Sequence, residues 1–502
     1  MRFLLAFCVV SIGLVELWSC QTQTDEREKV AQTYCGSCHL YPSPDLLPKK
    51  VWERTVLPQM GILAGIKSEI PNAKASDETD LSVLAPTQLI PQAEWLKIKQ
   101  FYLEKAPDAL AENSRNDEIE PFEGLFVPQP VPVKGEKVPN LTCVKIDPLR
   151  HCLYTYDEIY RTFWTLMPNT PSKSLNDSLA ICDMQALNGE VWLATHIGET
   201  VKVTKQRKGK VTLMNPATGQ TQQLLGGLYR PTQTLAIDLN NDAQEELVTC
   251  QFGYAEGQFS VWTRGAKGAY VEKVLSATPG AIRTVATDWN GDKLPDLVTL
   301  FAQGDERIVV YLNKGNLTFE EKVLLRFPPV YGSSYFELAD FNHDGKQDIL
   351  YTCGDNADYS IVFKSYHGVY IFENQGDNQL KQSYFFPVNG AYKAFARDFD
   401  NDGDLDLASI AFFLNPNAKH EEGFVYFENQ EGDFKPKHLN IGSLGRWLEM
   451  DAADIDGDGD IDIALGSHPL SPIPSPAQLD TRWYKGPGIV MLLNQTKQPL
   501  GL

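Results

Sequence analysis

An array of five acidic loops between residues 238 and 462 constrains the fold more than any other feature of the sequence. Each loop has oxygen-bearing side chains at its first, third, fifth and ninth positions, and successive loops start 50, 52, 58 and 56 residues apart. The residues concerned are Asp238, Asn240, Asp242, Glu246, Asp288, Asn290, Asp292, Asp296, Asp340, Asn342, Asp344, Asp348, Asp398, Asp400, Asp402, Asp406, Asp454, Asp456, Asp458 and Asp462. Runs that end in asparagine, such as those at Asn313 and Asn494, follow most of the loops. Repeats of β-strands with a period of this size indicate a propeller or a solenoid, so we expect a mainly β fold.

The chemistry of the loops predicts calcium binding. Carboxylate and amide oxygens at these spacings converge when the chain turns tightly, and they suit a hard cation with about six to eight ligands. The loops are not EF-hands, because Ser409 and Leu465 stand where the fourth and fifth loops would need a closing glutamate, and the flanks are predicted strands. The alternative is a set of solvated acidic turns, but five loops in register favour up to five calcium ions. The loop that begins at Asp238 departs most, since it lacks glycine and ends in Glu246.

These loops resemble the FG-GAP and VCBS repeats of integrin-like propellers, over roughly residues 126–496. The resemblance implies a disc of four-stranded blades with the calcium loops on one rim. A repeat region of about 370 residues with a period of about 54 gives about seven blades, of which the two amino-terminal ones would lack the metal loop. Propellers of this kind serve adhesion, ligand binding and, less often, catalysis, so the resemblance implies no single activity.

A second motif, Cys35-Gly-Ser-Cys38-His39, lies near the amino terminus. Two thiols and an imidazole on one short segment can attach a haem covalently through both cysteines and ligate its iron through His39. A Cys-x-x-Cys pair also suits a thioredoxin-like redox site or half of a zinc site. The zinc alternative lacks partners, because no other Cys or His occurs between residues 40 and 142, and the redox alternative lacks a βαβ context. The motif therefore predicts one covalent c-type haem.

Met60 is the candidate for the sixth iron ligand. It is the sole methionine between residues 21 and 120, and no second histidine competes with it there. Pro58 and Gly61 predict an irregular loop that presents the side chain. A thioether ligand raises the reduction potential of haem iron. The alternative is that Met60 only fills the core, as most methionines do.

A small helical domain is expected around the motif. Residues 26–36 and 92–103 have helical patterns, and Trp95, Ile98 and Tyr102 share one face of the second helix. Because these three side chains are large and mostly apolar, that face is expected to pack against the rest of the domain.

The second helix carries an aromatic pair ahead of Ala106-Pro107 and resembles the last helix of class I cytochromes c. The resemblance covers roughly residues 26–107 and implies an all-α haem domain. The expected organisation is a signal peptide at 1–20, a cytochrome c-like haem domain at 21–107, a linker at 108–125 and the propeller at 126–496.

The first twenty residues predict export. Arg2 precedes an apolar run from Phe3 to Val15, which is too short to span a bilayer and suits a signal peptide. Ser19-Cys20 then resembles the lipobox of bacterial lipoproteins, with Cys20 as the lipidated residue. An ordinary cleaved signal peptide is the alternative. Lipidation would tether the protein to a membrane, facing the periplasm or at the cell surface on the outer membrane.

Cys8 lies within the predicted signal peptide, and five further cysteines remain beyond residue 40. These five cannot all pair because their number is odd. Cys143 and Cys152 flank a predicted turn, and a disulfide between them is left open. Cys250 occupies a repeat position that is apolar elsewhere, at Leu300 and Ile410, so it is expected to be buried.

Three functions remain open from the sequence. The first is single-electron transfer by the haem, with the propeller docking a redox partner or binding a ligand. The second is a cell-surface propeller that binds a glycan or a protein. The third is a dehydrogenase with haem as electron acceptor, although no quinone-cofactor motif and no set of catalytic residues can be identified. The net charge of −20 argues against nucleic-acid binding.

Overall fold

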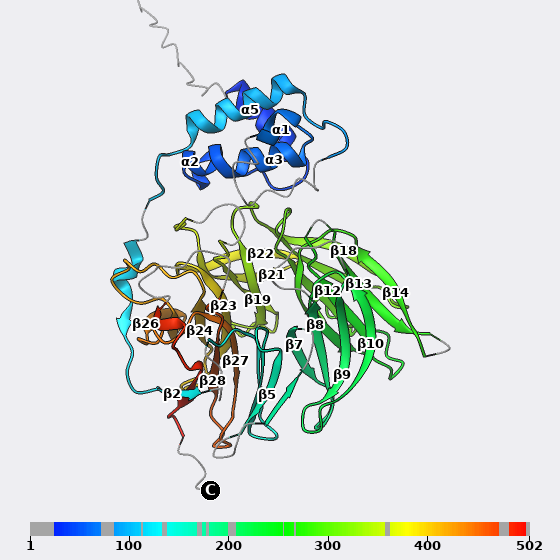
Figure 1. Cartoon of the computed structure of the whole chain (residues 1–502), viewed down its shortest axis with the longest axis vertical. Coiled ribbons are helices and arrows are strands. Elements are labelled where there is room, and N and C mark those ends of the chain that lie inside the picture. The colour runs from blue at the N-terminus through cyan, green and yellow to red at the C-terminus, as the bar shows by residue number, and fades with distance from the viewer. Residues whose placement is uncertain are drawn as a thin grey trace, which may run out of the picture.

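The computed structural model describes residues 25–71, 85–111, 114–132, 138–167, 173–176, 180–198, 207–254, 256–265, 268–356, 362–470 and 481–497. It contains a small helical unit and a ring of β-sheets, and the helical unit lies against one face of the ring (Figure 1). The predicted signal peptide and Cys20 lie outside the described residues. None of the described helices has the length and apolar composition needed to cross a bilayer.

The helical unit forms where the sequence predicts helices. Its elements are α1 (Glu26–Cys35), a 3₁₀ turn (Pro44–Leu46), the continuous helical run of α2 (Lys49–Val51), a π turn (Trp52–Val56) and α3 (Leu57–Leu63), a second 3₁₀ turn (Lys67–Glu69), and α5 (Gln92–Lys105). Asp25 caps α1, because its carboxylate accepts a hydrogen bond of 3.0 Å from the backbone nitrogen of Arg27.

The predicted face of α5 is buried. Trp95, Ile98 and Tyr102 are each at most 1% exposed. Tyr102 packs at 4.5 Å, between ring centroids, against Trp52, and its hydroxyl donates to the carbonyl oxygen of Pro42 at 2.6 Å. These contacts tie the segment that follows the Cys-x-x-Cys-His motif to the last helix of the unit.

The ring is a seven-bladed β-propeller, as the repeat period predicts. Blades 1 to 4 contain β3 (Leu141–Asp147), β4 (Cys152–Asp157), β5 (Thr162–Leu166) and β6 (Lys173–Asn176); β7 (Ala180–Ala186), β8 (Trp192–Gly198), β9 (Gly209–Asn215) and β10 (Gln220–Leu228); β11 (Pro231–Ile237), β12 (Glu246–Gln251), β13 (Gln258–Arg264) and β14 (Tyr270–Ser276); and β15 (Ala281–Thr287), β16 (Asp296–Phe301), β17 (Arg307–Asn313) and β18 (Phe319–Arg326). Blades 5 to 7 contain β19 (Ser333–Ala339), β20 (Asp348–Cys353), β21 (Gly368–Gly376) and β22 (Gln379–Pro387); β23 (Ala391–Arg397), β24 (Asp406–Ala411), β25 (Phe424–Gln430) and β26 (Asp433–His438); and β27 (Trp447–Ala453), β28 (Asp462–Ser467) and β29 (Gly488–Asn494), with β2 (Phe126–Pro132) as the fourth strand.

Strand β2 closes the ring. It comes from the start of the propeller but pairs antiparallel with β29 of the last blade, so the first and last parts of the propeller share one sheet. The first strands of successive blades contact one another all the way round and line a central channel. Closure leaves each blade packed between two neighbours.

The first strand of every blade carries a register shift close to its start. A bulge of this kind turns two consecutive side chains away from the regular alternation. At this place Thr142, Cys182, Thr232 and Ser334 donate to backbone carbonyls of the next blade's first strand, at 2.7, 3.3, 2.9 and 3.2 Å. The bulges therefore help to join blade to blade around the channel.

Part of the predicted linker is packed against the propeller. A 3₁₀ turn (Ser114–Glu118) places Asn116, which is 8% exposed and donates to the carboxylate of Glu422 at 3.1 Å. The two-residue strand β1 (Glu120–Pro121) then pairs in parallel with β26. The connection between the two units is thus anchored on blade 6.

The seven cysteines within the described residues are all free. Cys143 lies opposite Tyr156 and Cys152 lies opposite Asp147, so the two cysteines are not cross-strand partners. Cys250 is 0% exposed, which confirms that it is an apolar core residue.

Candidate functional site

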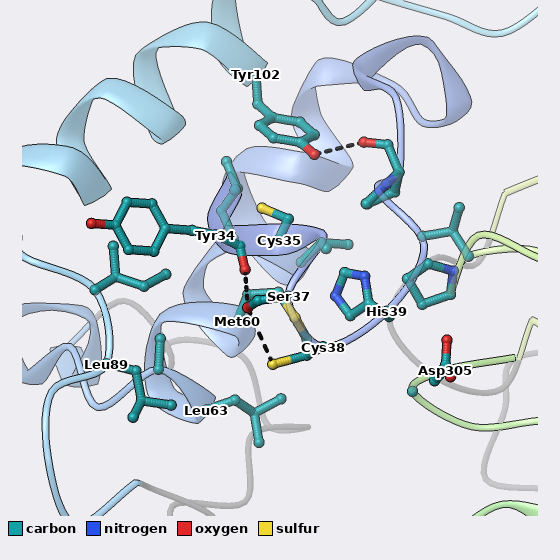
Figure 2. Close-up of a pocket in the computed structure, with 18 of the residues that line it drawn as sticks. Tyr34, Cys35, Ser37, Cys38, His39, Met60, Leu63, Leu89, Tyr102 and Asp305 are labelled. Carbon is teal, nitrogen blue, oxygen red and sulfur yellow. Dashed lines mark hydrogen bonds between the residues drawn. The ribbon is translucent and has the colours of Figure 1, made fainter. Parts of the chain in front are cut away.

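A cavity of about 380 Å³ surrounds the Cys-x-x-Cys-His segment. Cys35 is the last residue of α1, and the turn that follows brings Cys38 and His39 to the same cavity. Figure 2 shows these three side chains and Met60 around one space. Most of the remaining wall is apolar or aromatic and comes from Pro42, Trp52, Val56, Leu57, Leu63, Ala64, Leu89, Ile90, Trp95 and Tyr102. The sequence-predicted residues are therefore brought together by the fold.

The ring of His39 is oriented by its backbone. Its Nδ1 lies 3.0 Å from the carbonyl oxygen of Leu40. A carbonyl can only accept a hydrogen bond, so this contact requires the proton on Nδ1 and leaves the lone pair on Nε2. Burial lowers the pKa of His39 and favours the neutral imidazole. This is the tautomer that a histidine needs in order to bind a metal through Nε2.

The two thiols differ in their surroundings. Burial raises the pKa of Cys35 to about 11, whereas Cys38 is exposed at the cavity mouth. Between them, Ser37 donates from its hydroxyl to the carbonyl oxygen of Tyr34 at 2.7 Å (Figure 2). The hydroxyl also lies 3.6 Å from the sulfur of Cys38.

Met60 lines the cavity, but the loop predicted around it is wrong. Met60 belongs to α3, which continues directly from the π turn Trp52–Val56, so Pro58 interrupts the helical hydrogen-bond pattern without ending the helix. Gly61 serves close packing, because a Cβ at this position would lie 2.5 Å from Cγ of Glu69. The thioether is therefore presented from a helix that is wedged against the rest of the unit.

The propeller supplies part of the cavity wall. Gln303, Gly304 and Asp305 lie between β16 and β17, and Pro329 and Val330 lie between β18 and β19. None of these five residues was predicted from the sequence, since no local pattern connects them to a motif more than two hundred residues earlier.

Ion pairs within the propeller hold Asp305 in the cavity wall, and one hydrogen bond crosses between the units. The carboxylate of Asp305 accepts hydrogen bonds of 2.7 and 2.8 Å from Arg326 and lies 3.3 Å from Arg307. The hydroxyl of Tyr366 donates across the interface to the carbonyl oxygen of Leu46 at 3.1 Å. The cavity is thus a feature of the whole chain rather than of the helical unit alone.

The five acidic loops connect the first and second strands of blades 3 to 7. In an antiparallel blade these turns lie on one face, while the turns between second and third strands and the connections between blades lie on the other. The helical unit contacts the turn between β16 and β17 and the connection between β18 and β19, so it lies on the face opposite the acidic loops. The short hairpins of blades 1 and 2 at the equivalent place lack the pattern, as predicted.

Carboxylates converge in the last two loops. Ligand atoms of Asp398, Asp400 and Asp402 lie within 4.8 Å of one another, and those of Asp454, Asp456 and Asp462 form a second such group. Burial, together with the neighbouring carboxylates, raises the pKa values of Asp400 and Asp456. The first and third loop residues also accept hydrogen bonds from backbone nitrogens of their own loops, which holds the carboxylates in place.

The ninth residue of each loop has a structural task that the sequence analysis missed. In blade 7, Asp462 is 0% exposed, and its two oxygens accept from the backbone nitrogens of Ile455 in the loop and Asn494 at the end of β29, at 3.0 and 2.9 Å. The side chain of Asn494 in turn donates to the carbonyl oxygens of Ile461 and of Phe399, at 3.1 and 2.7 Å. Phe399 belongs to the loop of blade 6, so this asparagine joins two blades.

The same clamp recurs in other blades, where Asp296, Asp348 and Asp406 accept from the backbone nitrogens of Asn313, Asn374 and Asn429. It gives a physical reason for the run ending in asparagine that follows the loops. The sequence pattern that could have revealed this clamp is an aspartate at the ninth loop position followed, in the same repeat, by an asparagine at the end of a strand.

Replacing Asn494 with alanine should lower the free energy of unfolding by about 2–3 kcal/mol, because two buried carbonyl oxygens lose their donor. Denaturant titration of the full chain measures the effect. Asn417→Ala is the control, since Asn417 is exposed, and it should change stability by less than about 0.5 kcal/mol. Equal effects of the two variants would contradict the clamp.

Two segments, residues 288–351 and 398–465, match the family model described as FG-GAP-like repeat. They are FG-GAP repeats. They cover the acidic loops of blades 4 to 7, together with strands that flank them.

Curated relatives match over parts of the chain. Cartilage acidic protein 1 of Mus musculus is 27% identical over 191 residues, which is 35% of this chain and 28% of the relative, and its Homo sapiens counterpart is 29% identical over 160 residues, or 30% and 23%. Integrin alpha-PS5 of Drosophila melanogaster is 38% identical over 140 residues, or 25% of this chain and 14% of the integrin. The chain thus spans between 14% and 28% of the length of these relatives.

Among solved structures, the N-terminal domain of Nup159 aligns with 74% of this chain and 96% of its own length, at 11% identity and a TM-score of 0.42. Virginiamycin B lyase from Staphylococcus aureus aligns with 74% of this chain and 99% of its own length, at 9% identity and a TM-score of 0.46.

Proposed function

We propose that this chain is an exported electron-transfer protein that carries one c-type haem, bound covalently through Cys35 and Cys38. The observation that supports this most is the single cavity lined by both thiols, His39 and Met60. The two thiols would hold the haem covalently, and His39 and Met60 would bind its iron. Haem iron supplies a one-electron couple when it is bound.

The residues around the cavity suit the group. His39 keeps its Nε2 lone pair because Nδ1 donates to the Leu40 carbonyl, and the thioether of Met60 lies in the same wall. Trp52 and Tyr102 are buried and offer flat apolar surface to a porphyrin. The volume of about 380 Å³ lies within the range of about 300–1,000 Å³ typical of pockets for organic ligands. An apolar shell with a thioether favours ferrous over ferric iron, so a relatively high potential is expected.

We assign the acidic loops to calcium, with up to five ions on the propeller face away from the helical unit. The clustered carboxylates of the loops that begin at Asp398 and Asp454 are the best candidates. The loop that begins at Asp238 is the weakest, because it lacks glycine and ends in Glu246 rather than an aspartate.

Export fits both assignments. Haem attachment to Cys-x-x-Cys-His and extracellular calcium loops both suit a compartment outside the bacterial cytoplasm, and Cys20 would tether the chain to a membrane. Electrons then pass to or from a redox partner that reaches the exposed rim of the cavity, where Leu63 and Leu89 are 40% and 60% exposed. A cell-surface propeller that binds a protein or glycan is the second candidate, and the match to an integrin alpha chain favours it.

Substituting Met60 with alanine tests the electron-transfer assignment. The oxidised wild type should show the weak long-wavelength band of sulfur–iron bonding and should not bind carbon monoxide when reduced. The variant should lose the band, bind carbon monoxide, and show a potential lower by on the order of 100 mV, because the thioether no longer stabilises ferrous iron.

Spectra with and without dithionite and a redox titration measure these effects. The control is Met167→Ala, because Met167 lies in the propeller and is 40% exposed. A wild type that binds carbon monoxide readily and lacks the band would have a five-coordinate iron, and the carrier assignment would fail.

A further inference from the structure

A second cavity, of about 410 Å³, lies in the central channel of the propeller. Residues from all seven blades line it, and most of them belong to the first strands. Many come from the second and third positions of these strands, where the bulges lie. The first strands begin at the connections between blades, so the cavity lies toward the face that carries the helical unit.

The cavity wall differs in charge from the rest of the molecule. Five cationic side chains line it against four carboxylates, in a chain of net charge −20. Three of the five cations form ion pairs with carboxylates of the wall. These pairs are Lys145 with Asp183 at 3.6 Å, Lys393 with Glu449 at 2.8 Å, and Arg397 with Glu337. The remaining cations are Arg230 and Arg283, and within the described parts of the chain no carboxylate lies at ion-pair distance from either.

The two guanidinium groups retain unused donors. Nε of Arg230 is buried without a hydrogen-bond partner among the described residues, and Nη1 donates to the carbonyl oxygen of Gly253 at 3.2 Å. Arg283 donates through Nε to the carbonyl oxygen of Phe336 at 2.9 Å and lies 4.4 Å from the ring centroid of Tyr335. Both side chains are partly buried, and a cation that is partly removed from water without a counter-ion is unfavourable, so an anion in this cavity would stabilise both groups.

The backbone of Arg230 adds an independent observation. Arg230 has φ of 40° and directly precedes the first strand of blade 3. Three other blades have glycine at this place, namely Gly280, Gly332 and Gly390, with φ of 103°, 71° and 71°. A side chain in this left-handed region is strained, whereas glycine is not. An arginine retained at a position that glycine would occupy without strain points to a task for its side chain.

We propose that the channel cavity binds a small organic carboxylate, held by Arg230 and Arg283. The planar donors of arginine match the two oxygens of a carboxylate. Apolar and aromatic side chains complete the wall, including Ile282, Tyr392 and Leu448, which suits an anion with a carbon skeleton rather than an inorganic ion. The site does not depend on the proposed haem. A ligand bound here would lie toward the face that also carries the Cys-x-x-Cys-His cavity.

Calorimetric titration of the full chain with acetate, succinate and citrate tests this proposal. At least one of these carboxylates should bind, while succinamide, which lacks the charge, should not. Arg283→Gln and Arg230→Gly should each weaken binding by about tenfold or more, and Arg264→Gln, a change at an exposed arginine outside the channel, should leave it unchanged.

Thermal unfolding separates binding from structure. Arg230→Gly should keep or raise the melting temperature in the absence of ligand, because glycine relieves the left-handed backbone. If that variant does not fold, Arg283→Gln alone decides the question. The proposal is overturned if none of the three carboxylates binds at millimolar concentration, if inorganic phosphate binds more tightly than all of them, or if Arg283→Gln binds as the wild type does.

Discussion

Replacing Cys35 and Cys38 together with serine should abolish covalent haem. The thioether bonds that hold a c-type haem need both sulfur atoms, and a serine hydroxyl does not form them. Protein made in a host that matures c-type cytochromes should fall from one haem per chain to background. Acid–acetone extraction of the denatured protein, followed by a pyridine haemochrome spectrum of the precipitate, measures what stays attached.

Cys182→Ser is the matched control for this experiment. The thiol of Cys182 donates to the carbonyl oxygen of Pro231, and a hydroxyl can do the same, as Thr142, Thr232 and Ser334 do at equivalent positions. This variant should keep its haem. If acetone extracts all haem from the wild type, the covalent assignment is wrong, and the electron-transfer proposal falls with it.

Chelation of calcium should lower the melting temperature of the propeller by on the order of 10 °C. An ion that binds only the native state adds about 2.7 kcal/mol per site when its free concentration is about 100 times the dissociation constant. Without the ion, the carboxylates of Asp398, Asp400 and Asp402 repel one another at close range. Thermal unfolding in calcium and in excess EGTA, with metal analysis of the purified protein, measures the difference.

Single-loop variants locate the effect. Asp398→Ala and Asp454→Ala each remove one carboxylate from a cluster and should reduce the response to chelator. Asp433→Ala is the control, because Asp433 is an exposed aspartate on β26 outside the loops. Identical melting curves with and without chelator, together with an absence of bound calcium, would sink the calcium assignment and leave the loops as structural turns.

The blade architecture could be predicted because each blade is specified by a short sequence pattern and that pattern recurs along the chain. Each acidic loop reverses the chain between two strands of β-branched and aromatic residues, and the spacing of the loops counts the blades. The helices at 26–36 and 92–103 follow from residue patterns within a few turns, as does the buried face of Trp95, Ile98 and Tyr102. In all these cases the information lies within about twenty residues of the element it specifies.

Local rules failed at Met60, where Pro58 and Gly61 favoured a loop. Pro58 follows a π turn within a continuous helical run and does not end it, and Gly61 is there because Glu69 packs against its backbone. Whether this segment forms a loop or a helix depends on the contact with Glu69, and the tertiary fold determines that contact.

The sequence by itself determined the chemistry that is available: two thiols and an imidazole in one motif, five loops rich in carboxylates, and a repeat that makes blades. Tertiary structure alone decided what these groups meet. It placed Asp305 and Val330 of the propeller in the wall of the Cys-x-x-Cys-His cavity and made Asp462 a clamp between a loop and Asn494. It also left Arg230 and Arg283 without a carboxylate at ion-pair distance among the described residues. The physical reason is that these contacts join residues far apart in the chain, and ring closure and packing select such contacts after local structure has formed.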